Sequence, residues 1–342
     1  MNKREIYYDV LRIIAILAVI TIHVTAEVWY SDTISNYWLI NNFINAFVHS
    51  WAVPLFIAIT GALLLKKDID IKKVFLKYIP RVLICLIVWH YIYYFALGRT
   101  FTFESLKIAT HNLFIGKAFS HLWYLYLIIG IYILIPILCN LVQNLDKKKL
   151  LYLISILFII TILIPNIDML TDLDLSIYVT PFKVFTLNEY ILFLLLGYYL
   201  NTYEFKNKKV IIIISIISLL LLITNAWYGN HLSIINNAPM NFAKTNTVVS
   251  VLMVISLFLL AKTYLKGSNK GQKFITTIGE LTFGTYLVHF LVIKILTKYG
   301  LTVNFINPIF GNIIIIMLVA IISYLISYLI SKIPYVKKVI GL

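Results

Sequence analysis

The chain of 342 residues is strongly apolar: 61% of its residues are hydrophobic and only 13% are charged. Its mean hydropathy is +0.92. A soluble domain carries about a quarter charged residues and just under half apolar ones, so this composition excludes a soluble enzyme. The apolar residues form long runs near the roughly 20 residues that cross a bilayer as a helix, which predicts an all-α, multi-pass membrane protein.

Basic residues outnumber acidic residues by 29 to 14, which gives a net charge of +15. In a soluble protein this excess would suggest a nucleic-acid partner. In a membrane protein, lysine and arginine gather in the cytoplasmic loops, so we expect no nucleic-acid partner. The two cysteines, Cys85 and Cys139, both lie in apolar runs and indicate neither a disulfide framework nor a metal site.

The apolar runs predict a bundle of ten membrane helices. Their expected ranges are 8–28, 43–65, 79–97, 121–143, 150–165, 186–203, 209–227, 246–265, 275–297 and 309–331. The intervening loops leave no room for a soluble domain of about 50 residues or more. We therefore expect residues 1–342 to form a single integral-membrane domain without an extracytoplasmic domain.

The basic residues fall mostly on one side of the predicted bundle. That side carries 21 of the 29, in the N-terminal segment, the C-terminal tail and loops 66–81, 144–149, 204–209 and 262–273. Seven lie on the other side, and Arg12 lies within the first helix. Because cytoplasmic loops are the basic ones, both termini are expected in the cytoplasm, in agreement with an even number of helices.

Ionisable side chains recur on one face of the first predicted helix. His23 lies eleven residues after Arg12, close to three full turns of about 3.6 residues, so both share a face about 16 Å apart along the axis. Asp9 precedes Arg12 by three residues, and Glu27 follows His23 by four, where a carboxylate can hydrogen-bond an imidazole. Ionisable groups at membrane depth usually face a bundle interior or a wet cavity. The shared face favours a functional site over a snorkelling Arg12 or a hydrogen-bonded interior His23.

The seven histidines all fall in the outer half of the predicted topology or in its outer loops. A neutral imidazole can act as a general base near pH 7. His121 opens the fourth predicted helix beside Trp123, and His289 lies near the middle of the ninth. Glu280 in the ninth helix and Glu189 near the outer end of the sixth are candidate buried acids. For these residues, pairing within the bundle is an equally open interpretation.

Two further segments have both a structural and a functional interpretation. The second predicted helix contains Pro54 and Gly61. Such residues are tolerated in membrane helices and permit close helix packing, so packing is the favoured interpretation. The loop after it carries a basic cluster that includes Lys77 and Arg81. This cluster would attract anionic lipid headgroups, and it could equally hold the phosphates of a soluble donor.

Five motifs, taken together and in order, resemble those of the integral-membrane acyltransferase family 3. The most specific contains Arg12 and His23, which match the family's first-helix pattern of a basic residue followed by a histidine. Two positions depart from the family pattern: Thr60 stands where serine is usual, and Cys85 stands where proline is expected. The five matching segments are 8–23, 53–64, 79–89, 121–125 and 283–289.

This resemblance implies a ten-helix enzyme of the bacterial plasma membrane that transfers an acyl group across the bilayer. Family members include surface-polysaccharide O-acetyltransferases, among them the one that modifies enterobacterial common antigen. The donor would be cytoplasmic acyl-CoA, with acetyl-CoA as the leading candidate and no permanently bound cofactor. The acceptor would be a hydroxyl of a surface glycan or its lipid-linked precursor at the outer face. It would be reached directly or through a partner protein of glycan biosynthesis.

The resemblance also implies roles for individual residues. Arg12 and His23 would be the essential catalytic pair. His23, oriented by Glu27, would accept the proton of the attacking hydroxyl, and Arg12 would orient the CoA phosphates or stabilise charge at the thioester. Lys77 and Arg81 would guide the CoA phosphates at the entrance. The other expected substrate-binding residues are His121, Trp123, His289, Glu280 and Glu189.

Two other functions fit the same polar residues. A transporter or flippase for a small substrate or glycan precursor would also use intramembrane histidines and acids. Many transporters have repeated halves, and no such repeat is visible in this sequence. A membrane module that binds or senses a small molecule is the third interpretation. Consumption of acyl-CoA would separate the enzyme from both.

Overall fold

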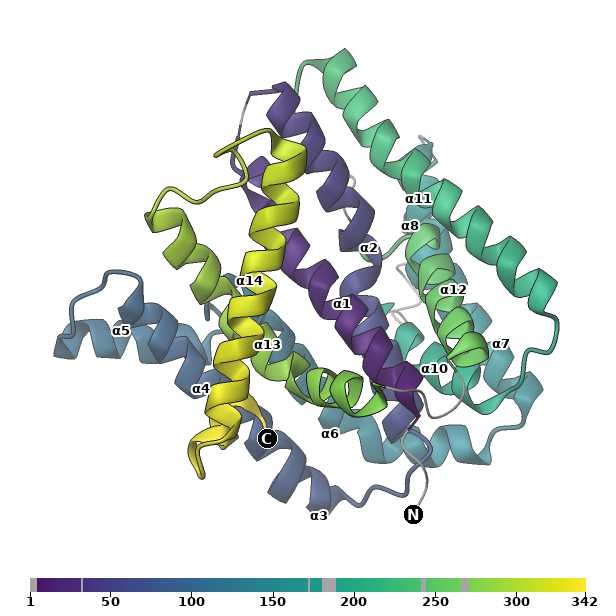
Figure 1. The fold of residues 1–342 in the computed structure, drawn as a ribbon. Coiled ribbons are helices and arrows are strands. Elements are labelled where there is room, and N and C mark those ends of the chain that lie inside the picture. The colour runs from purple at the N-terminus through teal and green to yellow at the C-terminus, as the bar shows by residue number, and fades with distance from the viewer. Residues whose placement is uncertain (1–4, 32, 172, 180–188, 241–243, 266–270) are drawn as a thin grey trace.

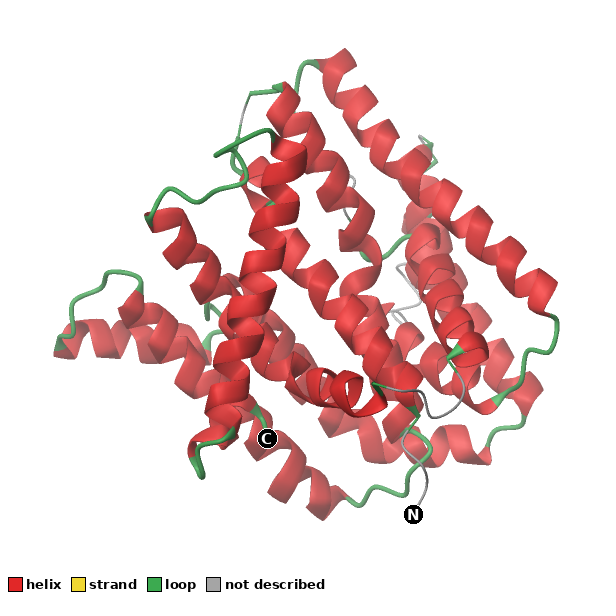
Figure 2. Ribbon diagram, viewed as in Figure 1, coloured by secondary structure: helices red, strands yellow, loops and turns green. Residues whose placement is uncertain are grey.

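The computed structural model describes residues 5–31, 33–171, 173–179, 189–240, 244–265 and 271–342. Across these ranges the chain is helical and contains no strand (Figure 2). Lipid offers no hydrogen-bond partners to the backbone. A helix satisfies its own N–H and C=O groups, so it is the element expected for such an apolar chain.

The α-helices, most of which are labelled in Figure 1, are joined in several places by short segments of 3-10 or π-helix, here designated η. The π-helical turns η2 and η4 continue one helix directly into the next, so residues 71–96 and 147–170 are unbroken helical stretches. In chain order the elements are α1 (Ile6–Val24), η1 (Ala26–Trp29), α2 (Asn36–Leu64), α3 (Ile71–Lys73), η2 (Val74–Tyr78), α4 (Ile79–Ala96), α5 (Phe103–Phe114), η3 (Ser120–Leu122), α6 (Trp123–Asn144), α7 (Lys147–Phe158), η4 (Ile159–Leu163), α8 (Ile164–Leu170), α9 (Ser176–Val179), α10 (Glu189–Thr202), α11 (Lys208–Asn236), α12 (Val248–Tyr264), α13 (Gln272–Lys298), α14 (Pro308–Ser331) and η6 (Val336–Ile340).

Within the described part of the chain, seven helical segments are long and apolar enough to cross a membrane. They are Ile6–Val24, Asn36–Leu64, Ser120–Asn144, Lys147–Leu170, Lys208–Asn236, Gln272–Lys298 and Pro308–Ser331. The prediction of a multi-pass helical membrane protein is therefore confirmed, and each range predicted from the sequence overlaps an observed helix. The count of ten spans and the cytoplasmic placement of both termini stay predictions.

Helix α1 ends at Val24, earlier than the sequence pattern predicts. Asn45 of α2 explains this end, because its Nδ2 donates to the backbone carbonyl of Ile22 at 3.0 Å and to Thr25 Oγ1 at 2.8 Å. The last carbonyl groups of a helix need such partners. Glu27 consequently lies in η1 and not on a continuation of α1. The expectation that the α-helix continues to residue 28 is therefore wrong, whereas the role of the Glu27 side chain stays a prediction.

Helix α1 lies in the middle of the bundle, where it packs against α2, α13 and α14 (Figure 1). Its first turn is fixed to α10, because the hydroxyls of Tyr7 and Tyr8 both donate to Asn201 Oδ1, at 3.1 and 2.6 Å. Lys262 of α12 donates three hydrogen bonds to backbone carbonyls at the end of α10. These polar contacts hold one end of α1 in a defined position.

Helices α2 and α10 approach each other at backbone distance through two glycines. A Cβ added at Gly61 would lie 1.9 Å from the carbonyl oxygen of Leu194, and one added at Gly197 would lie 1.9 Å from that of Ala58. Small residues permit this approach between membrane helices. The packing interpretation of the 53–61 segment is thus confirmed at Gly61.

The segment after α14 folds back against α4 and α13. Trp89 Nε1 donates to the backbone carbonyl of Val339 at 2.7 Å, and Ile340 is fully buried. Gly341 has a φ of 72°, and a Cβ there would lie 2.6 Å from the Phe283 ring. A glycine meets both requirements, because it adopts positive φ without strain.

Replacing Gly61 or Gly197 by alanine should destabilise the fold by about 1–3 kcal/mol or more, because overpacking forces neighbouring groups apart. Here the new Cβ would meet the backbone of the facing helix, which cannot move aside like a flexible side chain. Thermal unfolding of the detergent-purified protein measures the effect. Gly130→Ala on α6 is the matched control, since no atom lies within 4 Å of its added Cβ. An unchanged Tm for Gly197→Ala would contradict the close packing.

Candidate active site

A large cavity of about 1510 Å³ runs along α1. Its lining includes residues from both ends of that helix, from Glu5 before the first turn to Ala26 beyond the last. Helices α2, α4, α6 and α13 supply most of the remaining wall. Typical small-molecule pockets measure about 300–1,000 Å³, so this cavity can hold an unusually long ligand.

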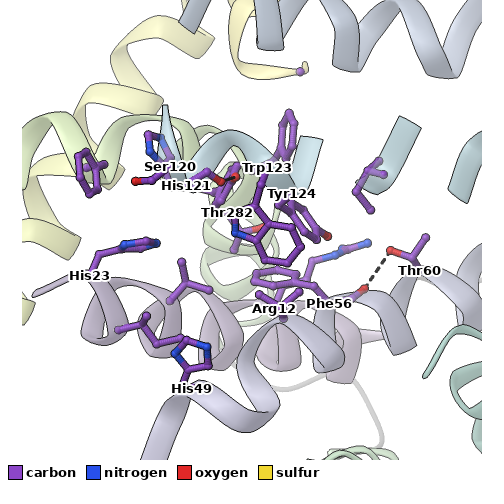
Figure 3. A pocket seen from close by; sticks show the side chains of 18 of the residues that line it. Arg12, His23, His49, Phe56, Thr60, Ser120, His121, Trp123, Tyr124 and Thr282 are labelled. Atoms are coloured by element: carbon purple, nitrogen blue, oxygen red, sulfur yellow. Dashed lines mark hydrogen bonds between the residues drawn. The ribbon is translucent and has the colours of Figure 1, made fainter. Parts of the chain in front are cut away.

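Arg12 and His23 both line this cavity, at different depths along α1 (Figure 3). Arg12 Nη1 donates to Asp9 Oδ1 at 2.9 Å, and the Asp9 side chain is fully buried. A buried carboxylate requires such a partner. Gly279 of α13 makes room for it, since a Cβ there would lie 2.6 Å from the Cβ of Asp9. The guanidinium of Arg12 is therefore held at the cavity wall.

Basic residues surround the end of the cavity near the start of α1. Lys66 and Lys67 directly follow α2, and Arg81 lies in the first turn of α4. Together with Arg12 they bring four positive charges to this end, which we call the basic mouth. The acidic residues that line the same end are Glu5, Asp9 and Glu280.

The surroundings of Lys67 disfavour its charged form. Desolvation by the surrounding protein lowers the pKa of Lys67 from its ordinary value of 10.5, and the charges of Lys66, Lys73 and Arg12 lower it further. An anion bound among these groups would relieve their repulsion. The basic mouth is therefore suited to phosphate or another multiply charged anion.

Three histidines from separate parts of the chain meet further along the cavity, and Figure 3 shows two of them, His23 and His121. The ring centroids of His23 and His289 are 5.2 Å apart, those of His121 and His289 are 5.5 Å apart, and those of His23 and His121 are 6.1 Å apart. Phe290 contacts all three rings. We refer to His23, His121 and His289 as the histidine cluster.

The histidine cluster has unused hydrogen-bonding capacity. Both ring nitrogens of His121 and Nε2 of His289 are buried without a partner among the residues that the structure describes. Buried polar groups in native proteins are nearly always paired. Because His121 lines the cavity, its unpaired nitrogens indicate a place where a ligand completes the hydrogen bonds.

Two tyrosines fix the backbone around the histidine cluster. The Tyr286 hydroxyl donates to the backbone carbonyl of His121. The Tyr93 hydroxyl donates to the carbonyl of Leu287 at 2.7 Å and accepts from the N–H of Leu291 at 3.1 Å. These hydrogen bonds join η3 and α4 to α13 and so fix the backbone that carries His121 and His289.

Several residues predicted from the sequence lie at the cavity and others lie away from it. Trp123 and Glu280 line it with Arg81, whereas His289 lies fully buried behind the lining. Lys77 is exposed in η2, outside the lining. The predicted role of each of these residues stays a prediction.

Two predicted acids have different surroundings. Glu189, in the first turn of α10, accepts a hydrogen bond from Thr245 Oγ1 at 3.4 Å, and Thr245 itself lines the cavity. The side chain of Glu27 lies outside the part of the chain that the structure describes.

Several cavity residues have no site role that the sequence pattern predicts. His49 of α2 lines the cavity and packs against Trp29, with ring centroids 5.5 Å apart. No spacing within one helix connects His49 to α1, so only the packing of α2 reveals it. Lys66 and Lys67 were attributed to topology alone. Their position directly after an apolar helix is the signal that places them at a membrane surface.

The fold and the cavity together define a class of protein: a multi-pass helical membrane protein whose interior holds a cavity with a basic mouth and a histidine cluster. The model of the acyltransferase domain of family 3 matches residues 5–332. The chain belongs to this family, as its motifs predict, and is an acyltransferase. Neither a curated protein nor a solved structure matches the chain.

The lowered pKa of Lys67 predicts a reactive amine at the basic mouth. At a given pH more of this amine is uncharged, so Lys67 should react with an acylating reagent at lower pH than the exposed Lys209 of α11. Peptide mass spectrometry after labelling between about pH 7 and 10 measures both. Inorganic pyrophosphate should protect Lys67 and leave Lys209 unaffected. Identical pH profiles for the two lysines would contradict the crowding of charge.

Proposed function

We propose that this protein is an O-acyltransferase that moves an acyl group, in the simplest case acetyl, from cytoplasmic acyl-CoA to a hydroxyl of a surface glycan or its lipid-linked precursor at the outer face. The observation that carries the proposal is the cavity along α1, which joins the basic mouth to the histidine cluster. Membership of an acyltransferase family supports the reaction class.

The basic mouth fits the donor. CoA carries phosphates at one end and a thioester at the end of a long arm, and Lys66, Lys67 and Arg81 offer charged donors for the phosphates. Arg12 lies between them and His23, about 16 Å from His23 along the helix at 1.5 Å per residue. An extended arm lying along α1 would bring the thioester to the histidine cluster.

His23 is the base in this proposal. It accepts the proton of the acceptor hydroxyl while the hydroxyl oxygen attacks the thioester carbonyl. The tetrahedral intermediate collapses, the carbon–sulfur bond breaks, and the proton passes from His23 to the CoA thiolate. His121 has ring nitrogens without a partner among the described residues, so it can donate a hydrogen bond to the carbonyl oxygen as negative charge develops there.

The acceptor approaches from the opposite end of the cavity, where Trp29, Tyr30 and Lys294 contribute to the lining. The loop charges predict that this end faces outward. A surface glycan or a lipid-linked saccharide could then reach His23 without passing the basic mouth. The proposal places the protein in the bacterial plasma membrane, beside partner proteins that make the glycan, and requires no permanently bound cofactor.

A transporter or flippase is the alternative, because lining residues at both ends of α1 would also suit a passage for a substrate. The two functions differ in chemistry. An acyltransferase breaks one thioester bond for every acyl group that it transfers, whereas a flippase moves its substrate without consuming acyl-CoA.

Replacing His23 or Arg12 by alanine should abolish acyl transfer. Loss of a general base costs typically 10²–10⁴-fold in rate, and loss of Arg12 also leaves the buried Asp9 carboxylate without its ion pair. The measurement is transfer of label from radiolabelled acetyl-CoA by the purified protein in lipid vesicles. Membranes of the producing bacterium, with the gene deleted, supply the acceptor.

His231→Gln is the matched control for that experiment, because His231 is exposed on α11 and stacks on Trp227 away from the cavity. It should retain the wild-type rate. Uptake or flipping without acyl-CoA consumption would refute the enzyme. Mass spectrometry of surface glycans with and without the gene identifies the acceptor, and an unchanged acylation pattern would exclude a surface glycan.

Substitution of the basic mouth should weaken donor binding more than chemistry. Lys67→Ala and Arg81→Ala should each raise the KM for acetyl-CoA by roughly tenfold, as expected when a charged hydrogen bond worth about 1.5–3 kcal/mol is removed. The kcat should change little, and the effect should shrink at high salt. Lys209→Ala is the control, because Lys209 is exposed on α11 and is not among the residues that line the cavity. A lowered kcat with an unchanged KM would place these residues in the chemical step instead.

A further inference from the structure

We propose that His289 is a positioning residue for His23: its Nε2 accepts the N–H of one His23 nitrogen and thereby leaves the other His23 nitrogen facing the cavity as a base. The inference rests on the proposed acyl transfer. It is an alternative to the expectation that Glu27 orients His23, which stays a prediction because the Glu27 side chain lies outside the part of the chain that the structure describes.

The tautomer of His289 follows from its hydrogen bond. Its Nδ1 lies at the backbone carbonyl oxygen of Tyr286. A carbonyl oxygen only accepts, so Nδ1 must carry the hydrogen, and Nε2 of the neutral ring is left with a lone pair. That Nε2 is buried and has no partner among the described residues. A buried acceptor that lacks a hydrogen bond costs free energy, so the site favours a hydrogen-bond donor beside Nε2.

Of the aromatic rings recorded in contact with His289, the His23 ring has the shortest centroid distance. Its centroid lies 5.2 Å from that of His289, compared with 5.5 Å for His121. The His121 ring lies flat on Phe290, with an interplanar angle of 14° and a centroid distance of 4.8 Å, which restricts its rotation. The edge of the same Phe290 meets His23 at 88°. Catalytic hydrogen bonds are often long in the free enzyme and tighten with substrate bound.

The pairing makes the acid–base step independent of a nearby carboxylate. Among the side chains that the structure describes, no Asp or Glu forms an ion pair with a histidine of the cluster. His23 gains a proton from the acceptor hydroxyl at one nitrogen while its other N–H stays bonded to Nε2 of His289. The proton then leaves to the CoA sulfur, so His289 neither gains nor loses one in the cycle.

No group of three or more histidine, cysteine or acidic side chains within the described ranges has the arrangement of a metal site. The contacts between the rings therefore suit hydrogen bonding among imidazoles.

The experiment compares His289→Leu with His289→Gln in the full-length protein in lipid vesicles, with radiolabelled acetyl-CoA and membranes of the gene-deleted bacterium as acceptor. His289→Leu should lower kcat roughly 100-fold or more, the scale of losing an oriented base, with the KM for acetyl-CoA unchanged. His289→Gln should recover a large part of kcat, because its amide oxygen can accept at the position of Nε2. The control His231→Gln should match the wild type.

Nitrogen-15 NMR of histidine-labelled wild-type protein tests the same pairing without any change at His289. The signals of His23 are identified by their loss in His23→Gln. We expect a single His23 tautomer with one hydrogen-bonded N–H, and the Nδ1–H tautomer for His289. An equal mixture of His23 tautomers would overturn the proposal even if His289→Leu failed to fold.

Three kinetic outcomes would also overturn it. The first is a wild-type kcat in His289→Leu, and the second is a His289→Gln variant as inactive as His289→Leu. The third is a loss of kcat in Glu27→Gln while both His289 variants stay active, which would assign the orienting role to Glu27. If the wild type itself transfers no label, the acyltransferase function fails and this proposal fails with it.

Discussion

Polar groups on α1 have to be kept away from lipid, and this constraint organises the bundle. An arginine at the centre of a bilayer costs about 2.5–3.5 kcal/mol or more. Arg12 therefore lines the cavity and pairs with the buried Asp9. The surrounding helices approach closely enough to enclose these groups because glycines such as Gly279 and Gly197 stand at the tight contacts. The resulting cavity separates the polar face of α1 from lipid. A ligand in the cavity can contact that same face.

Much of the fold could be predicted from the sequence, because lipid forces the backbone into helices and sets their length. Every predicted range overlaps a helix in the structure. The ends were harder to place, since they depend on contacts between helices. The end of α1 is set by Asn45, a residue of another helix whose amide takes a carbonyl in the last turn. No pattern within residues 8–28 reveals that contact.

The candidate site was predictable where its residues share one helix. The spacing of Arg12 and His23 places both on one face, and both line the cavity. His121 and His289 come close to His23 only because of how η3 and α13 pack against α1. No spacing within one helix links these three residues, so the sequence does not predict that they form one cluster. Glu27 shows the limit of spacing within one helix. Its spacing from His23 assumes that the α-helix continues, whereas α1 ends at Val24.

The order of the elements along the chain bears on how the protein is assembled. Helix α1 is made before α13 and Gly341, which supply part of the wall that covers its polar face. Until then the Arg12–Asp9 pair has only the earlier helices beside it. The hydrogen bond from Trp89 to the carbonyl of Val339 holds the segment after α14 against α4. The cavity wall is therefore complete only once α13 and the segment after α14 have been made, so the site cannot form until most of the helices have been synthesised.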